Sequence, residues 1–77
     1  MSDLHSQPDP MMVMEVLKNP DEIRVSRGDH TVYLFYKAKA AKRWVCAVSK
    51  RVTIEEGFLI TAYITEAIKE GEKIWPK

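Results

Sequence analysis

The segment Gly57–Thr65 reads Gly-Phe-Leu-Ile-Thr-Ala-Tyr-Ile-Thr and separates its side chains into two sets when it is read at a period of two. One set is wholly apolar and consists of Phe58, Ile60, Ala62 and Ile64. The other set mixes an apolar side chain with hydroxyl groups and consists of Leu59, Thr61, Tyr63 and Thr65. A strand with one face toward a core and the other toward solvent or a ligand has this pattern. The segment therefore predicts a sheet with two different faces.

The size of the chain predicts one small domain. Its 77 residues can fold alone but leave little core to spare. The hydrophobic fraction of 45% and the charged fraction of 30% are ordinary for a folded protein. The formal net charge is only +1, from 12 basic and 11 acidic residues. Nucleic-acid binders usually carry a larger basic excess, so any contact with RNA must come from a local patch.

Cysteine usage and the first residues predict a cytoplasmic location. Cys46 is the only cysteine and lies in the apolar run Trp44–Val48, so it cannot form an intramolecular disulfide and is interpreted as a buried packing residue. Such usage is typical of reducing compartments. The segment Met1–His5 lacks the positive start and apolar stretch of a signal peptide. No apolar run approaches transmembrane length, so no membrane partner is expected.

The N-terminal part predicts a flexible tail followed by a helix. Residues 1–8 are polar and aperiodic, so residues 9–77 are expected to form the single α+β domain. Asp9 before Pro10 is a typical helix N-terminus, and Asn19 before Pro20 is a typical end. The apolar stripe of this helix consists of Val13, Val16 and Leu17. Met11, Met12 and Met14 on the same helix are either core filler or a partner surface.

The remaining segments predict a four-stranded antiparallel meander packed against the N-terminal helix. Its strands are expected at Glu22–Ser26, Thr31–Lys37, Arg43–Ser49 and from Gly57 onward. The helix is expected to cover the face that carries Phe58, Ile60, Ala62 and Ile64. A short C-terminal helix or turn is expected at Ile64–Lys69, ended by Gly71, with Trp75 folding back on the edge of the core.

The spacing of the possible metal ligands and of the glycines excludes metal sites and phosphate-binding loops. His5, His30, Cys46 and the carboxylates do not show the spacing that zinc or calcium sites require, so no metal is expected. The three glycines are isolated in turns, so the chain has no glycine-rich phosphate loop and no cofactor is expected.

A dispersed polar set is compatible with metal-independent cleavage of RNA. Cleavage needs a base for the 2′-hydroxyl, an acid for the leaving oxygen, and cations or hydroxyl donors for the phosphorane charge. Neighbouring strands could bring cations beside the hydroxyls of the last strand, and Tyr33 and Phe35 could stack an unpaired base. The same residue types also occur in strands for packing alone, or as solvated charges. The polar set consists of His5, Arg24, Ser26, Lys37, Arg43, Thr61 and Tyr63.

Several segments together resemble a known family. They are Asn19–Ile23 with Ser26, Val32–Tyr36, the strand Gly57–Tyr63 and the final stretch Ile68–Trp75. In these segments the chain is similar to small prokaryotic and phage proteins of the barnase–EndoU–colicin–RelE-like (BECR) nuclease family. The resemblance covers the chain from Pro8 onward. Its most specific part is Thr61-Ala62-Tyr63 followed by Ile68–Trp75.

The resemblance implies a ribonuclease-like domain, toxin- or phage-associated, that cuts RNA without metal on the open face of its sheet. It implies RNA and an inhibitor or antitoxin protein as partners. His5 corresponds to the family's histidine before the helix and is the acid/base candidate, Arg24 corresponds to the positive residue after the turn, and Thr61 to the threonine of the last strand. Tyr63 completes the expected catalytic set. The expected RNA- or phosphate-binding residues are Ser26, Tyr33, Lys37 and Arg43.

The alternative function is a non-catalytic protein-interaction module. Its open sheet face, with Tyr33, Phe35, Leu59 and Tyr63, would dock a partner or a second copy of the chain. The two functions differ in what that face presents. Convergence of Arg24, Lys37 and Arg43 favours RNA, whereas a continuous apolar surface favours protein association.

Overall fold

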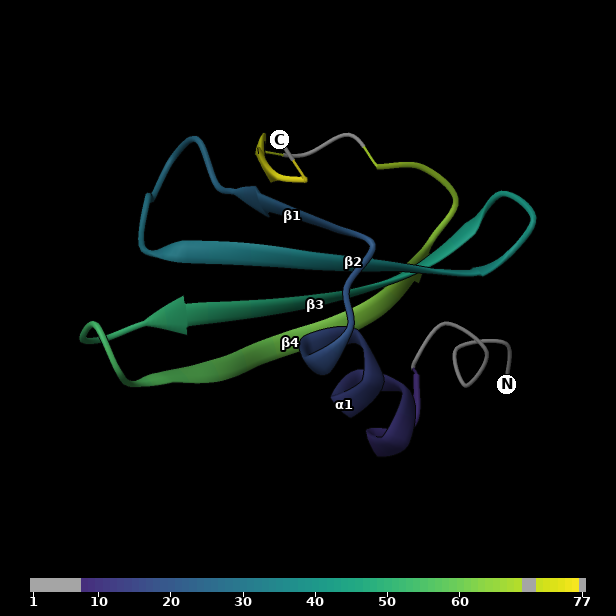
Figure 1. Cartoon of the computed structure of the whole chain (residues 1–77), viewed down its shortest axis with the longest axis horizontal. Coiled ribbons are helices and arrows are strands. Elements are labelled where there is room, and N and C mark those ends of the chain that lie inside the picture. Colours follow the sequence, from purple (N-terminus) through teal and green to yellow (C-terminus); the bar gives the residue numbers. More distant parts are fainter. Residues whose placement is uncertain (1–7, 69–70, 77) are drawn as a thin grey trace.

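A single helix packs on a five-stranded antiparallel sheet (Figure 1) in the computed structural model, which describes residues 8–68 and 71–76. The elements are α1 (Pro10–Lys18), β1 (Glu22–Val25), β2 (Val32–Ala40), β3 (Arg43–Arg51), β4 (Gly57–Thr65) and β5 (Glu72–Trp75). The strand order is β4-β3-β2-β1-β5, and every neighbouring pair is antiparallel. The α+β class and the N-terminal helix are confirmed, and β1 to β4 form the expected meander. The expected number of four strands was one too few.

The helix begins and ends where its sequence signals predict. The Asp9 carboxylate accepts a hydrogen bond of 2.9 Å from the N–H of Met12, and Pro10 occupies the first helical turn. The helix ends at Lys18, and Asn19 caps it before Pro20. Val13 and Val16 point into the core, so the short helix is held by packing rather than by its own propensity.

The β2–β3 hairpin is tighter than the sequence suggests, whereas the β1–β2 connection is longer. β2 runs to Ala40, so only Ala41 and Lys42 connect it to β3, and Lys42 takes a positive φ of 60°. Between β1 and β2, the Asp29 carboxylate accepts hydrogen bonds from the Thr31 hydroxyl at 2.6 Å and the Thr31 N–H at 2.9 Å. These bonds, with a further one from Lys50, lower the pKa of Asp29 from 3.8 to about 2. The carboxylate that orders this turn is therefore ionised throughout the neutral range.

Both sides of the sheet carry buried side chains. On the side that α1 covers, here called the helix face, Val45 and Ala47 pack against Val13 and Val16. On the opposite side, the far face, a second cluster forms around Tyr36, which is 1% exposed. Its members are Leu34, Tyr36 and Cys46, with Trp44, Val48, Tyr63 and Ile68 packed around them. The centre of the far face is therefore buried rather than open.

A β-bulge in β4 changes which side chains reach the core. Thr61 and Leu59 face consecutive residues of β3, so Ile60 is an extra residue without a partner on that strand. Ala62 and Ile64 pack on the helix-face cluster as expected. Phe58 and Ile60 are instead 53% and 49% exposed. The expectation that all four side chains share a covered face is wrong, because the bulge breaks the period of two.

The C-terminal part forms a strand where the sequence predicted a helix or turn followed by a folded-back tryptophan. Ile64 and Thr65 belong to β4, and residues 69–70 lie outside the described residues. Gly71, with a φ of 80°, lies directly before β5 instead of ending a helix. β5 pairs with β1, and Trp75 lies opposite Ile23 with 46% of its surface exposed. None of the helices in the described ranges is long and apolar enough to cross a membrane.

Candidate functional site

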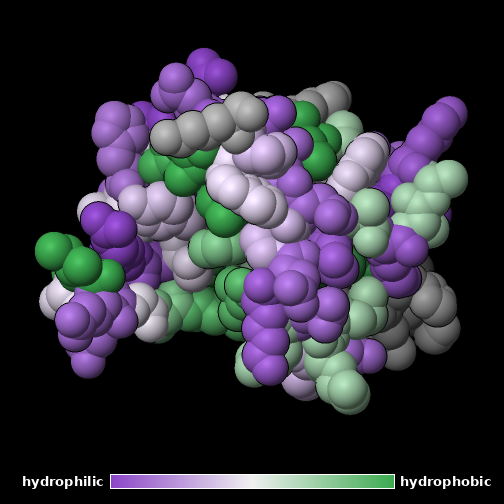
Figure 2. Space-filling model, viewed as in Figure 1, coloured by the Kyte–Doolittle hydropathy of each residue, from purple (hydrophilic) through white to green (hydrophobic). Residues whose placement is uncertain are grey.

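The helix is too small to cover its side of the sheet. The nine residues of α1 span about 14 Å at 1.5 Å per residue. Five strands spaced about 4.8 Å apart give a sheet roughly 19 Å wide, and a nine-residue strand is about 30 Å long. Parts of the helix face beside and beyond α1 therefore stay uncovered, and apolar side chains reach the surface near β4 and α1 (Figure 2).

A groove of about 530 Å³ lies between α1 and β4. This α1–β4 groove is lined by Pro8, Pro10, Val13, Met14, Leu17, Leu59, Thr61 and Ala62. No residue in its lining carries a charge. Met14 is 52% exposed, and its flexible thioether can adapt to different apolar surfaces. Of the two uses predicted for the methionines, the exposed Met11 and Met14 fit a partner surface, whereas Met12 packs on the core.

β4 is an outermost strand of the sheet, so one of its edges has no neighbouring strand in the described part of the chain. Its nine residues include no charge and no proline. Residues 57–61 are exposed, with Leu59 at 45% beside Phe58 and Ile60. Natural sheets usually blunt such an edge with charged residues, prolines or very short strands. A bulge is a further such device, and β4 has one at Ile60, but the first half of the strand has no charge and no proline.

The other edge of the sheet is protected. β5 is only four residues long and contains Glu72 and Lys73. Pro76 follows the strand directly and has no backbone N–H to offer a further strand. The two edges therefore differ in length and in charge, and β4 is the edge suited to strand addition.

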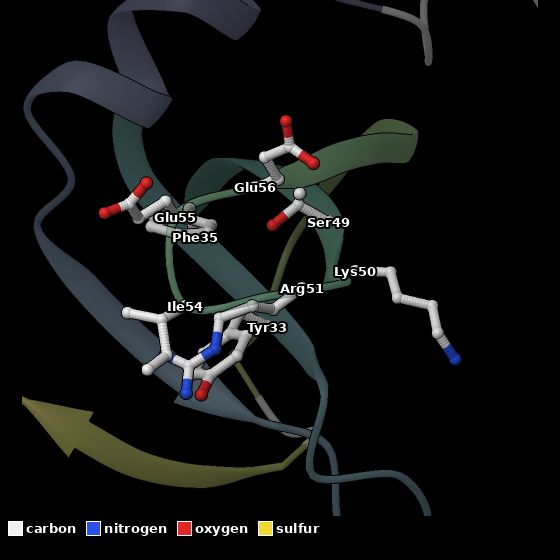
Figure 3. Close-up of a pocket in the computed structure, with 9 residues that line it drawn as sticks. Tyr33, Phe35, Ser49, Lys50, Arg51, Ile54, Glu55 and Glu56 are labelled. Carbon is white, nitrogen blue, oxygen red and sulfur yellow. The ribbon is translucent and has the colours of Figure 1, made fainter.

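A smaller depression of about 270 Å³ lies at the end of the sheet that α1 does not reach (Figure 3). Its apolar floor includes Tyr33 and Phe35, and the loop between β3 and β4 contributes Ile54, Glu55 and Glu56. The Arg51 guanidinium carbon lies 5.7 Å from the centre of the Tyr33 ring, a cation–π distance. Tyr33 and Phe35 thus lie together, as base stacking would need, but Glu55 and Glu56 put negative charge at the rim.

Arg24 and Thr61 lie on the same face without being neighbours. The strand register places them in one row across the far face, with Leu34 and Val48 between them. Three strand spacings separate them, about 14 Å. Arg24 is also engaged: its Nε donates to the Glu22 carboxylate at 2.5 Å and its guanidinium donates to the Gly71 carbonyl at 3.3 Å.

Tyr63 lies in the next row, where its hydroxyl interacts with Tyr36. Burial raises the pKa of Tyr36 above its ordinary value, and interactions with Cys46 and Tyr63 raise it further. Both tyrosines therefore belong to the far-face cluster and contribute to its packing.

The other predicted residues are dispersed. Lys37 lies on the helix face, where its ammonium donates to the Asn19 carbonyl at 2.9 Å and ties the end of α1 to β2. Arg43 is exposed at the start of β3. Ser26 follows β1, and its backbone N–H donates to the Val32 carbonyl. His5 lies outside the described residues. Arg24, Lys37 and Arg43 therefore do not converge on one surface.

No family model matches the chain, and no curated protein or solved structure matches it significantly. The functional assignment therefore rests on the geometry of the site. Within residues 8–68 and 71–76, no group of His, Cys, Asp and Glu side chains is placed to hold a metal ion. The candidate site is accordingly the exposed half of β4 with the α1–β4 groove. The sequence analysis did not predict that the β4 edge and the groove form one site. The long uncharged run of Gly57–Thr65 was the signal that could have indicated it.

Proposed function

We propose that the chain is a non-catalytic protein-interaction module that binds an extended segment of another protein along the edge of β4. One observation carries the proposal: a nine-residue, uncharged strand edge lies directly beside an apolar groove. In strand addition, backbone hydrogen bonds supply affinity and alternate side chains of the added strand enter neighbouring pockets. Here the α1–β4 groove is placed to receive those side chains.

The chemistry of the surface defines the partner segment. The exposed half of β4 offers backbone groups, Phe58, Leu59 and Ile60, but no charge to attract an oppositely charged segment. Glu55 and Glu56 precede the strand and would repel acidic segments. The partner segment is therefore uncharged, extended and rich in β-branched or aromatic residues.

Selection from a library of random peptides tests this function. The selection uses the wild-type chain, with Ile60→Lys as counter-selection and Ile74→Lys as the matched control on the β5 edge. Both isoleucines are partly exposed, at 49% and 39%, so neither lysine disrupts a core. We expect uncharged peptides that bind the wild type and Ile74→Lys but not Ile60→Lys. Peptides that bind all three proteins equally, or an absence of binding peptides, would contradict the proposal.

RNA cleavage is the second candidate function, and it is favoured by the common placement of Arg24, Thr61 and Tyr63 on the far face. In it, His5 would exchange protons and Thr61 would stabilise the phosphorane charge, while Arg24, three strands away, would bind a different phosphate of the same RNA.

Incubation of labelled total RNA in EDTA with wild type, Thr61→Val and His5→Ala tests this candidate. Thr61 is exposed, so valine should leave the fold intact. Cleavage by the wild type alone would establish the nuclease. Cleavage by none of the three proteins would eliminate it, and equal cleavage by wild type and Thr61→Val would remove Thr61 from the mechanism.

A further inference from the structure

We infer that the protein segment added to β4 carries acidic residues at the end that passes Thr65, where two exposed cations of the β2–β3 hairpin, Lys42 and Arg43, bind them. The inference rests on the proposed function and deepens it, because it adds a charged flank to the uncharged stretch that pairs with β4. Three features carry it: the separation of charge along the chain, the position of the hairpin tip at the end of β4, and the backbone conformation of Lys42.

Charge is unevenly distributed along the chain. Residues 30–54 contain six of the twelve cations and none of the eleven carboxylates, although the whole chain is almost neutral. Three of these cations, Lys39, Lys42 and Arg43, lie at the tip of the β2–β3 hairpin and are exposed. None of the three forms an ion pair with another residue of the described ranges. Lys39 lines a small depression together with Glu15 of α1, so Lys42 and Arg43 are the cations best placed to bind a partner.

The tip of the hairpin projects beyond the point where the chain leaves β4 (Figure 1). Thr65, the last residue of β4, lies opposite Trp44, so Lys42 and Arg43 lie past the end of that strand. A strand added to β4 would lie two strand spacings from β3, about 10 Å. This distance is close to the Debye length of about 8 Å at physiological ionic strength, and long side chains shorten it. Acidic residues past Thr65 would therefore be attracted to the tip.

The course of the chain after β4 separates the tip from the next carboxylate. Glu66 follows Thr65, but the chain bends at Glu66 and continues to Ile68, which packs on the far face. Arg43 lies on the opposite side, because its neighbour Trp44 packs on the far-face cluster and side chains alternate along a strand. The Arg43 side chain is therefore on the helix face, as is the α1–β4 groove. An acidic partner residue on that side faces Arg43 rather than Glu66.

The other end of β4 carries the opposite charge. Glu55 and Glu56 are exposed directly before the strand begins. The two cations that precede them in sequence are engaged, Lys50 in an ion pair and Arg51 in its contact with the ring of Tyr33. Acidic residues of a partner are thus repelled at the start of β4 and attracted at its end. The two ends together fix which end of the added segment carries the acidic residues.

The backbone of Lys42 gives a further reason to assign a role to its charge. Lys42 has a φ of 60°, in the left-handed region that favours glycine and asparagine. The connection between β2 and β3 consists of Ala41 and Lys42 alone, so the lysine occupies a turn position for which it is poorly suited. Unfavourable backbone conformations concentrate at binding sites. Lys42→Gly would remove the charge and suit the turn, so it separates binding from folding.

Fluorescence anisotropy with labelled peptides tests the inference. A peptide from the selection is extended by two glutamates at its N-terminus, by two glutamates at its C-terminus, or by two glutamines at either end. The proteins are wild type, Lys42→Gly/Arg43→Gln, and the control Lys18→Gln/Lys73→Gln, which loses two exposed cations elsewhere. We expect glutamates at one end alone to tighten binding to the wild type about fivefold. Lys42→Gly/Arg43→Gln should abolish this gain, and the control should keep it.

The outcomes separate the acidic flank from the β4 edge. Binding of the glutamine peptides with no gain from glutamates would overturn the inference and leave the proposed function intact. Equal gains at both ends, or a gain that survives Lys42→Gly/Arg43→Gln, would also overturn it. Binding of no peptide would remove the proposed function and the inference with it. A short oligouridine that binds the wild type more tightly than the acidic peptides, but not Lys42→Gly/Arg43→Gln, would overturn the inference by assigning the tip to nucleic acid.

Discussion

Tyr36→Ala should lower the free energy of unfolding by about 3–5 kcal/mol. Tyr36 is 1% exposed and fills the centre of the far-face cluster between Leu34 and Cys46. Its removal leaves a cavity the size of a ring in a core with few other large side chains. A domain of 77 residues is stable by roughly 4–12 kcal/mol in total. We therefore expect a largely destabilised protein, measured by urea denaturation followed by circular dichroism.

Two further variants assign that loss to the ring. Tyr36→Phe keeps the ring and removes only the hydroxyl that interacts with Tyr63, so a loss of about 1–2 kcal/mol is expected. Tyr33→Ala removes a tyrosine that is only half-buried, so its loss should be smaller than that of Tyr36→Ala. Equal losses for Tyr36→Ala and Tyr36→Phe would show that the ring does not support the far face.

Gly71→Ala should lower the free energy of unfolding by about 2–4 kcal/mol and loosen β5. Gly71 has a φ of +80°, which disfavours any side chain. A Cβ atom at this position would also lie 2.6 Å from the Val25 carbonyl oxygen and 3.2 Å from Leu34. Since Val25 belongs to β1, the backbone must separate β1 from β5 to admit the methyl group. The Gly71 carbonyl would then lose its hydrogen bonds from Arg24 and Arg27.

The control for this variant is Gly28→Ala. A Cβ atom at Gly28 would meet no atom within 4 Å, so its effect should stay within about 0.5 kcal/mol. Urea denaturation measures both variants, and NMR shifts of residues in β1 and β5 report where the change occurs. Equal stability of the two variants would contradict the close approach of Gly71 to β1.

Local signals in the sequence predict most of the individual elements. Asp9 and Asn19 bound α1 as expected, because capping and proline geometry depend on neighbouring residues alone. The bulge at Ile60 has no such local signal, since it exists only relative to β3. β5 was missed for the same reason: its four residues form a strand because β1 offers an edge that they can pair with.

The candidate site depended on register and strand order, which the sequence alone does not reveal. Arg24 and Lys37 both lie on strands, but the pairing puts Arg24 on the far face and Lys37 on the helix face. The hydroxyls of Thr61 and Tyr63 were recognised as one set, yet Tyr63 packs in a core cluster while Thr61 is exposed. The edge position of β4 follows only from the strand order. An uncharged strand in the middle of a sheet would carry no implication for binding.

Amide hydrogen exchange along the two sheet edges tests the central claim most directly, because it reports strand addition at the backbone groups themselves. The measurement compares Gly57–Thr61 with the β5 amides, with and without a peptide from the selection described above. We expect the outward-facing amides of Gly57–Thr61 to exchange more slowly when the peptide is bound, and the β5 amides to stay unchanged. Unchanged exchange at β4 with the peptide bound, or slower exchange at β5 instead, would contradict strand addition at β4.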